Sequence, residues 1–133
     1  MKKTKRLTLD EWTLEEKEKK YLEVIKSAFK TGDIDALKSS RRHALKNLRK
    51  RERRITRKLI NAAKKENLIV NGNNIDLFEK ELLKKHQELY ELLSRIDFDT
   101  ESLVDQALEL EKSIIENVDA LLLELNKTSD NKN

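Results

Sequence analysis

The chain contains no proline, and its only glycines are Gly32 and Gly72. Proline and glycine are the residues that most readily interrupt a helix, so few positions in this chain favour the end of a helix. Ala, Glu, Lys, Arg and Leu make up 74 of the 133 residues, a share typical of long helices and coiled coils. The sequence therefore predicts an all-α fold, with breaks near the two glycines.

Apolar residues recur at helical spacing along most of the chain, and this periodicity predicts about four helices. Two Thr-x-x-Glu capping boxes, Thr8–Glu11 and Thr13–Glu16, mark alternative starts for the first helix. Gly32 suits the left-handed position after that helix, and Asp33 suits the N-cap of the next. The predicted segments are an N-terminal helix within 1–31, a long basic helix over 33–66, a helical hairpin over 75–127 and a disordered tail over 128–133.

The connections between these helices are short, which favours an antiparallel arrangement. Asn71-Gly72 is a strong turn signal, and the apolar residues beside it would allow a very short β-hairpin. Neither arm alternates for more than about three residues, so we favour a helix–helix connection there. We expect one helical domain over 1–133, an antiparallel bundle or coiled-coil hairpin of about four helices. Part of the long basic helix could project from it, and we expect a homodimer or small homo-oligomer.

No catalytic, cofactor or metal site is predicted. The absence of cysteine excludes disulfides, thiolate catalysis and zinc–thiolate sites. His43 and His86 are the only histidines, and neither has another histidine three or four residues away. No apolar run approaches the roughly 18 residues that a membrane span needs. We therefore expect a cytoplasmic, non-enzymatic protein that acts by binding, without contact with a membrane.

The charges are segregated along the chain. The net charge is only +4, but residues 38–65 hold 13 Lys and Arg against the single acid Glu52. Residues 97–133 hold ten Asp and Glu against three Lys. This asymmetry indicates a positively charged surface on the second helix and a negatively charged one on the last.

On a helical wheel, most cations of the second helix share one broad arc, and the apolar residues occupy the remainder. Arg41, Arg51 and Glu52 fall among or beside the apolar residues. A row of cations on one side of a helix suits a phosphate backbone. The predicted nucleic-acid-binding residues are Arg42, Lys46, Arg49, Lys50, Arg53, Arg54, Arg57 and Lys58.

Other interpretations of this cationic arc stay open at this stage. An acidic partner protein, or the acidic last helix of the same or a second chain, would also complement it, and a charged arc can simply be solvated. No Phe, Tyr or Trp lies between residues 30 and 77, which favours duplex or structured nucleic acid over single strands. Asn47, Arg49 and Arg53 would be placed to contact bases if the helix entered a major groove.

Overall fold

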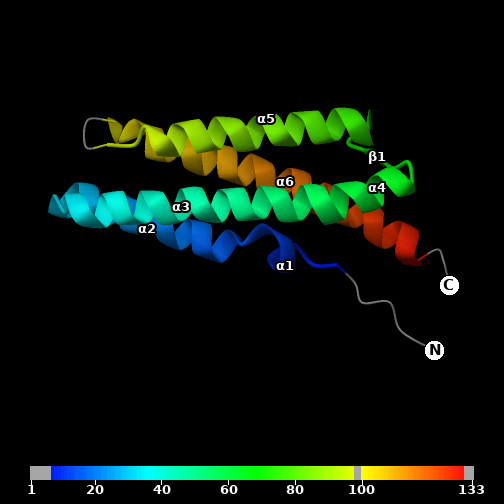
Figure 1. Cartoon of the computed structure of the whole chain (residues 1–133), viewed down its shortest axis with the longest axis horizontal. Coiled ribbons are helices and arrows are strands. Elements are labelled where there is room, and N and C mark those ends of the chain that lie inside the picture. The colour runs from blue at the N-terminus through cyan, green and yellow to red at the C-terminus, as the bar shows by residue number, and fades with distance from the viewer. Residues whose placement is uncertain (1–6, 98–99, 131–133) are drawn as a thin grey trace.

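The computed structural model describes residues 7–97 and 100–130 and shows a bundle of helices with one very small sheet (Figure 1). The predicted all-α fold is confirmed. The elements in chain order are α1 (Leu9–Thr13), α2 (Glu15–Thr31), α3 (Ile34–Arg54), the π-helical segment η1 (Ile55–Ile60), α4 (Asn61–Lys65), β1 (Ile69–Val70), β2 (Asn73–Asn74), α5 (Ile75–Ser94) and α6 (Ser102–Asp130).

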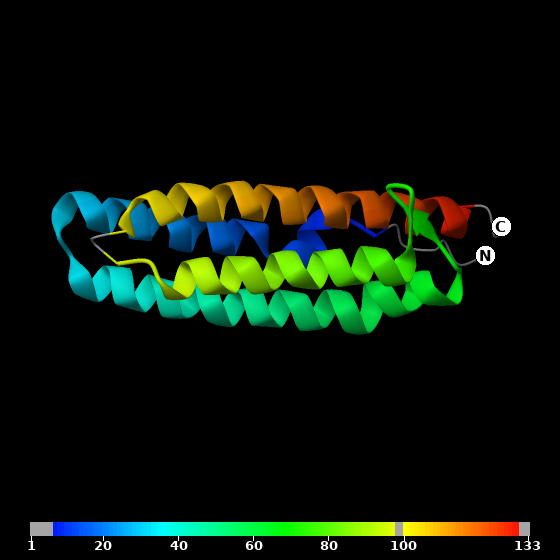
Figure 2. The same cartoon turned by 90° about the horizontal axis from the view of Figure 1, so that it is seen from above.

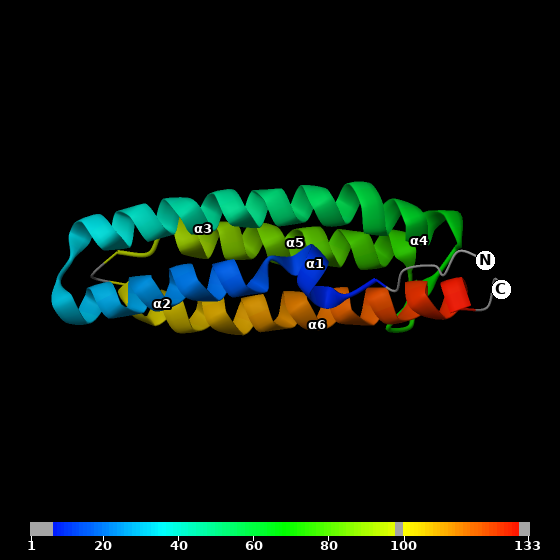
Figure 3. The same cartoon turned by 90° about the horizontal axis from the view of Figure 1, so that it is seen from below.

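The four long helices run antiparallel to their neighbours in the chain (Figures 2 and 3). α3 lies beside both α2 and α5, and α6 lies beside both α5 and α2. α3 and α6 therefore occupy diagonally opposite corners of the bundle. The basic helix consists of α3, η1 and α4, which we together call the α3 column. This column does not project from the bundle, because α4 at its end packs on α5 and α6.

The predicted turn between the first two long helices is confirmed. Gly32 adopts φ +71°, and its N–H donates to the carbonyl of Ala28 over 2.8 Å, closing the end of α2. The Asp33 carboxylate then accepts a hydrogen bond from the Ala36 N–H over 3.0 Å and caps α3. Both residues perform the roles that their chemistry predicts.

The N-terminal segment forms two helices, and α2 begins at Glu15, beside the second of the two predicted starts. Leu14 adopts the left-handed conformation, with φ 53°, and separates α1 from α2. Neither predicted capping box forms: the Thr8 side chain makes no capping hydrogen bond, and the Thr13 hydroxyl donates back to the Leu9 carbonyl over 3.1 Å. At this break the carbonyls of Thr13 and Leu14 accept hydrogen bonds from side chains of α3.

The second helix passes through a π-helical segment at Ile55–Ile60 before α4. A π turn bonds residue i to i+5 and holds one residue more than an α turn, so it shifts the phase of the helix. On a regular α-helix, Ile60 would fall among the cations. With the shift it is completely buried, together with Ile55 and Ala63.

The connection between α4 and α5 is a very small antiparallel hairpin, in which Ile69 pairs with Asn74 and Val70 with Asn73. The interpretation as a helix–helix connection is therefore wrong. Asn71 and Gly72 adopt φ of 54° and 80°, the pattern that suits a two-residue turn matching the twist of the strands. Burial of Val70 in the bundle core holds this short pairing in place.

The core runs through the whole bundle and contains residues from all its long helices. Trp12, Tyr21 and Phe29 are half-buried and pack against this core, as expected for docking contacts of the N-terminal segment. α6 continues to Asp130, past its predicted end at 127, so residues 128–130 do not belong to a disordered tail. Residues 131–133 lie outside the described part of the chain.

Candidate functional site

The eight predicted cations lie on one outward side of the α3 column. We call them the basic face. Seven are exposed, and Arg54 is half-buried. Lys46, Lys50, Arg53 and Arg57 follow one another at spacings of four, three and four residues, so they stand on successive turns. They form a ridge whose part within α3, from Lys46 to Arg53, is about 10 Å long at the α-helical rise, and Arg57 continues it in η1.

Three arginines at the edges of this surface are held by neighbouring elements. Arg41 Nη1 donates to the Ile96 carbonyl over 2.7 Å, beyond the end of α5. Arg54 Nη1 donates to the Glu11 carbonyl of α1 over 3.0 Å. The Arg49 guanidinium carbon lies 4.6 Å from the centre of the Tyr90 ring of α5. The arginines at one edge of the basic face therefore contact α5 and the segment after it, and Arg54 at the other edge binds α1.

The acidic last helix does not cover the basic face of its own chain. Its outer carboxylates are exposed, and α6 is diagonal to α3 in the bundle. Within residues 7–97 and 100–130, no ion pair joins the basic face to α6. The outer carboxylates in question are those of Asp105, Glu109, Glu116 and Asp119 of α6 and of Glu101, just before it.

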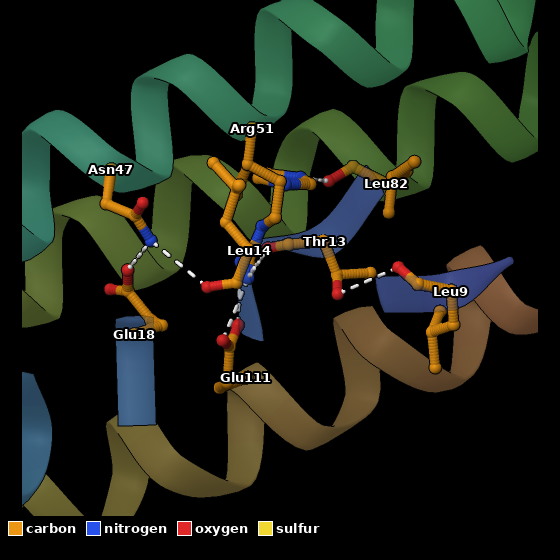
Figure 4. A network of polar contacts seen from close by, with 9 residues as sticks. Leu9, Thr13, Leu14, Glu18, Asn47, Arg51, Leu82 and Glu111 are labelled. Carbon is orange, nitrogen blue, oxygen red and sulfur yellow. Dashed lines mark hydrogen bonds and ion pairs between the residues drawn. The ribbon is translucent and has the colours of Figure 1, made fainter. Parts of the chain in front are cut away.

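One cation of the α3 column is absent from this face. Arg51 is completely buried, and its guanidinium forms a two-pronged ion pair with Glu111 of α6, at 2.6 and 2.8 Å (Figure 4). Its Nη1 also donates to the Thr13 carbonyl over 3.2 Å. The sequence placed Arg51 among the apolar residues of the wheel, but it gave no sign that Glu111 is the partner.

A second buried group lies beside this ion pair. Asn47 Nδ2 donates to Glu18 Oε2 over 2.5 Å and to the Leu14 carbonyl over 3.5 Å (Figure 4). Because Asn47 is turned into the bundle, the hypothesis that it contacts bases is wrong. The left-handed Leu14 places the carbonyls of Thr13 and Leu14 within reach of α3, so the α1–α2 break supplies acceptors to both Arg51 and Asn47.

Burial shifts the pKa of two groups in this region in opposite directions. Desolvation raises the pKa of Glu18 to about 7, although the Asn47 hydrogen bond and the Arg51 charge lower it. Desolvation, with the nearby Arg51 charge, lowers the pKa of His86 to about 4, although the Leu82 hydrogen bond raises it. His86 donates through Nδ1 to that carbonyl over 2.9 Å and is fully buried, more deeply than the partial burial expected from its sequence position.

Replacing Glu18 with glutamine is expected to change the pH dependence of stability. A carboxyl group with a raised folded-state pKa stabilises the fold below about pH 4.5, and this contribution is lost as the pH rises to about 7. His86 contributes in the opposite direction, between about pH 4 and 6.5, and partly masks the effect in the wild type. The free energy of unfolding of the Glu18→Gln variant, minus that of the wild type, should therefore rise by about 3 kcal/mol from about pH 4.5 to about pH 8.

The measurement is urea unfolding of both proteins at about pH 4.5 and about pH 8. Glu23→Gln is the matched control, because Glu23 is exposed on the same helix. Its difference from the wild type should hardly depend on pH. A Glu18→Gln difference that is equally independent of pH would contradict a buried Glu18 with a raised pKa.

Other candidate groups have structural surroundings that do not suggest chemistry. His43 Nδ1 donates to the Ser39 carbonyl over 2.7 Å, and the ring lies 5.6 Å from that of Tyr21. Among the described residues, no three metal-binding side chains of His, Cys, Asp or Glu come together. None of the described helices is both long enough and apolar enough to cross a membrane.

Comparisons of the chain with known protein families, with curated proteins and with solved structures find no match.

Proposed function

We propose that this protein is a non-enzymatic nucleic-acid-binding protein with an accessory or regulatory role. In this proposal the basic face contacts the phosphate backbone of duplex or structured nucleic acid. The observation that carries the proposal is that exposed cations, without acids among them, stand on successive turns of a helix. The bundle fixes this helix between α2 and α5.

The arrangement costs stability in the free protein. Like charges three or four residues apart on a helix repel by a few tenths of a kcal/mol for each pair. Solvated helix faces usually mix signs, as Glu15 and Lys19 do on α2, where they form an ion pair of 2.8 Å. A polyanion removes this repulsion and releases its own condensed counterions when it binds. The cost is therefore accounted for by a ligand with closely spaced negative charges.

An acidic protein partner is the competing proposal. Because α6 of the same chain lies diagonally across the bundle, such a partner would have to come from another molecule. A nucleic-acid backbone presents phosphates along a continuous line, with a charge density high enough to condense counterions. The ridge from Lys46 to Arg57, with cations on successive turns, fits this line. The predicted homodimer or small homo-oligomer and the cytoplasmic location stay predictions.

The test is a titration of duplex DNA and structured RNA at several salt concentrations. Each phosphate contact contributes about −0.9 to the slope of log affinity against log salt, so about five to eight contacts predict a slope of roughly −5 to −7. Polyglutamate serves as the acidic-protein control and should compete weakly. The proposal fails if neither nucleic acid binds in dilute buffer, and tight binding of polyglutamate alone would favour the protein partner.

A further inference from the structure

A hollow of about 430 Å³ lies where α3 passes α5, at one edge of the basic face. Cations make up most of its lining, and none of the lining residues within 7–97 and 100–130 is acidic. Leu45 and the Tyr90 ring supply the apolar part. The cations are Lys38, Arg41, Arg42, Lys46 and Arg49.

Tertiary structure brings an aromatic ring to this surface. The basic helix itself contains none, which by itself favours duplex over unpaired strands. Tyr90 comes from α5, and Arg49 lies over its ring at 4.6 Å. Unstacked bases bind proteins by stacking on aromatic rings or on the planes of arginine guanidinium groups. An exposed guanidinium that already rests on a ring offers such a plane.

The cations around this pair are suited to phosphate, and one of them is fixed. Arg41 uses Nη1 to bind the Ile96 carbonyl, which holds its guanidinium in place. A guanidinium has five N–H donors, and among the described residues this is the only hydrogen bond that Arg41 makes. A cation that is positioned beforehand loses less side-chain entropy on binding than the exposed lysines of the ridge. The hollow therefore differs from the ridge in having both a stacking surface and a positioned guanidinium.

We infer that this hollow binds an unpaired nucleotide, at the end or in a bulge of the nucleic acid that the basic face contacts. The base stacks on the Arg49–Tyr90 pair, and the neighbouring phosphates are bound by Arg41 and the lysines beside it. The inference rests on the proposed function, because the ridge would hold the adjoining helical part. It adds a preference for junctions between paired and unpaired strands.

Two probes with the same number of phosphates isolate the stacking contribution. One is a duplex with a short single-stranded overhang, and the other is the same duplex whose overhang lacks bases. Stacking of one base contributes enough to predict that the wild type binds the intact overhang about 10-fold more tightly. The pair of probes is made with the overhang at the 5′ end and with the overhang at the 3′ end.

Arg49→Lys and Arg53→Lys form a matched pair of variants. Both keep the charge and remove the planar guanidinium, but only Arg49 lines the hollow, and both positions are exposed. Arg49→Lys should abolish the preference for the overhang with bases, and Arg53→Lys should keep it. Tyr90→Leu, which leaves an apolar side chain in place, should act like Arg49→Lys.

The outcomes separate this inference from the proposed function. Equal affinity of the wild type for the two probes would overturn the nucleotide site and leave backbone binding standing. Binding only of the intact overhang would support the site and refute contact with the duplex backbone. Absence of binding to either probe would overturn both, and loss of the preference in Arg53→Lys as well would show that the hollow is not its source.

Discussion

Replacing Arg51 with methionine is expected to lower the free energy of unfolding by about 3–5 kcal/mol. Arg51 is completely buried, and its charge is balanced by the two oxygens of Glu111 at 2.6 and 2.8 Å. Removing the guanidinium leaves that carboxylate without its counter-charge in the core and takes a donor from the Thr13 carbonyl. An unbalanced buried charge costs far more than the ion pair contributes, so the single variant should be severely destabilised.

The double variant Arg51→Met/Glu111→Leu should recover most of this loss. Buried ion pairs replaced as a unit by apolar residues of similar size are often as stable as the original. Arg53→Met is the control, because Arg53 is an exposed cation two residues away, and it should change stability by no more than about 0.5 kcal/mol. Urea unfolding at neutral pH measures all three. If Arg51→Met costs no more than Arg53→Met, the buried ion pair is not present in solution.

Reversing four charges on the ridge is expected to reduce affinity for duplex nucleic acid by at least about 1,000-fold in moderate salt. The variant carries glutamate in place of Lys46, Lys50, Arg53 and Arg57. All four side chains are exposed, so the fold should be unaffected, with helicity by circular dichroism equal to that of the wild type. Each lost phosphate contact removes about one unit of the salt slope, and the new carboxylates repel the backbone.

A control with the same change in net charge separates a local surface from a general charge effect. Lys80, Lys84, Lys112 and Lys127 are exposed on α5 and α6 and belong neither to the basic face nor to the lining of the hollow. Reversing these four should weaken binding much less and should leave the salt slope close to that of the wild type. An equal loss in both variants would show that overall charge governs binding and that the basic face has no special role.

Some predictions rested on local chemistry and needed no knowledge of the tertiary structure. Gly32 and Asp33 end one helix and begin the next because a left-handed glycine and a capping carboxylate act on the backbone beside them. The outward position of Lys46 and Arg53 follows from helical geometry, since no arrangement of the bundle buries the polar side of an amphipathic helix without a partner. These are the features that sequence reasoning predicted correctly.

The features that the sequence did not predict share a different cause. The break at Leu14 opposes the local preference of a leucine, and its left-handed conformation is accompanied by the bonds that Thr13 and Leu14 carbonyls accept from Arg51 and Asn47. The π turn opposes regular helical geometry, and it is accompanied by the burial of Ile60. In each case, contacts made many residues away along the chain outweigh a local preference of about 1–2 kcal/mol.

The sequence by itself therefore determined the fold class, the end of α2 and the one-sided distribution of positive charge. Only the tertiary structure decided that Arg51 leaves the cationic surface for Glu111, that Asn47 turns inward to Glu18, and that Tyr90 joins Arg49 at the edge of the basic face. The physical reason is that helix periodicity and capping act between residues a few positions apart. Charge pairing and stacking depend on which helices become neighbours, and this is fixed only when the whole core packs.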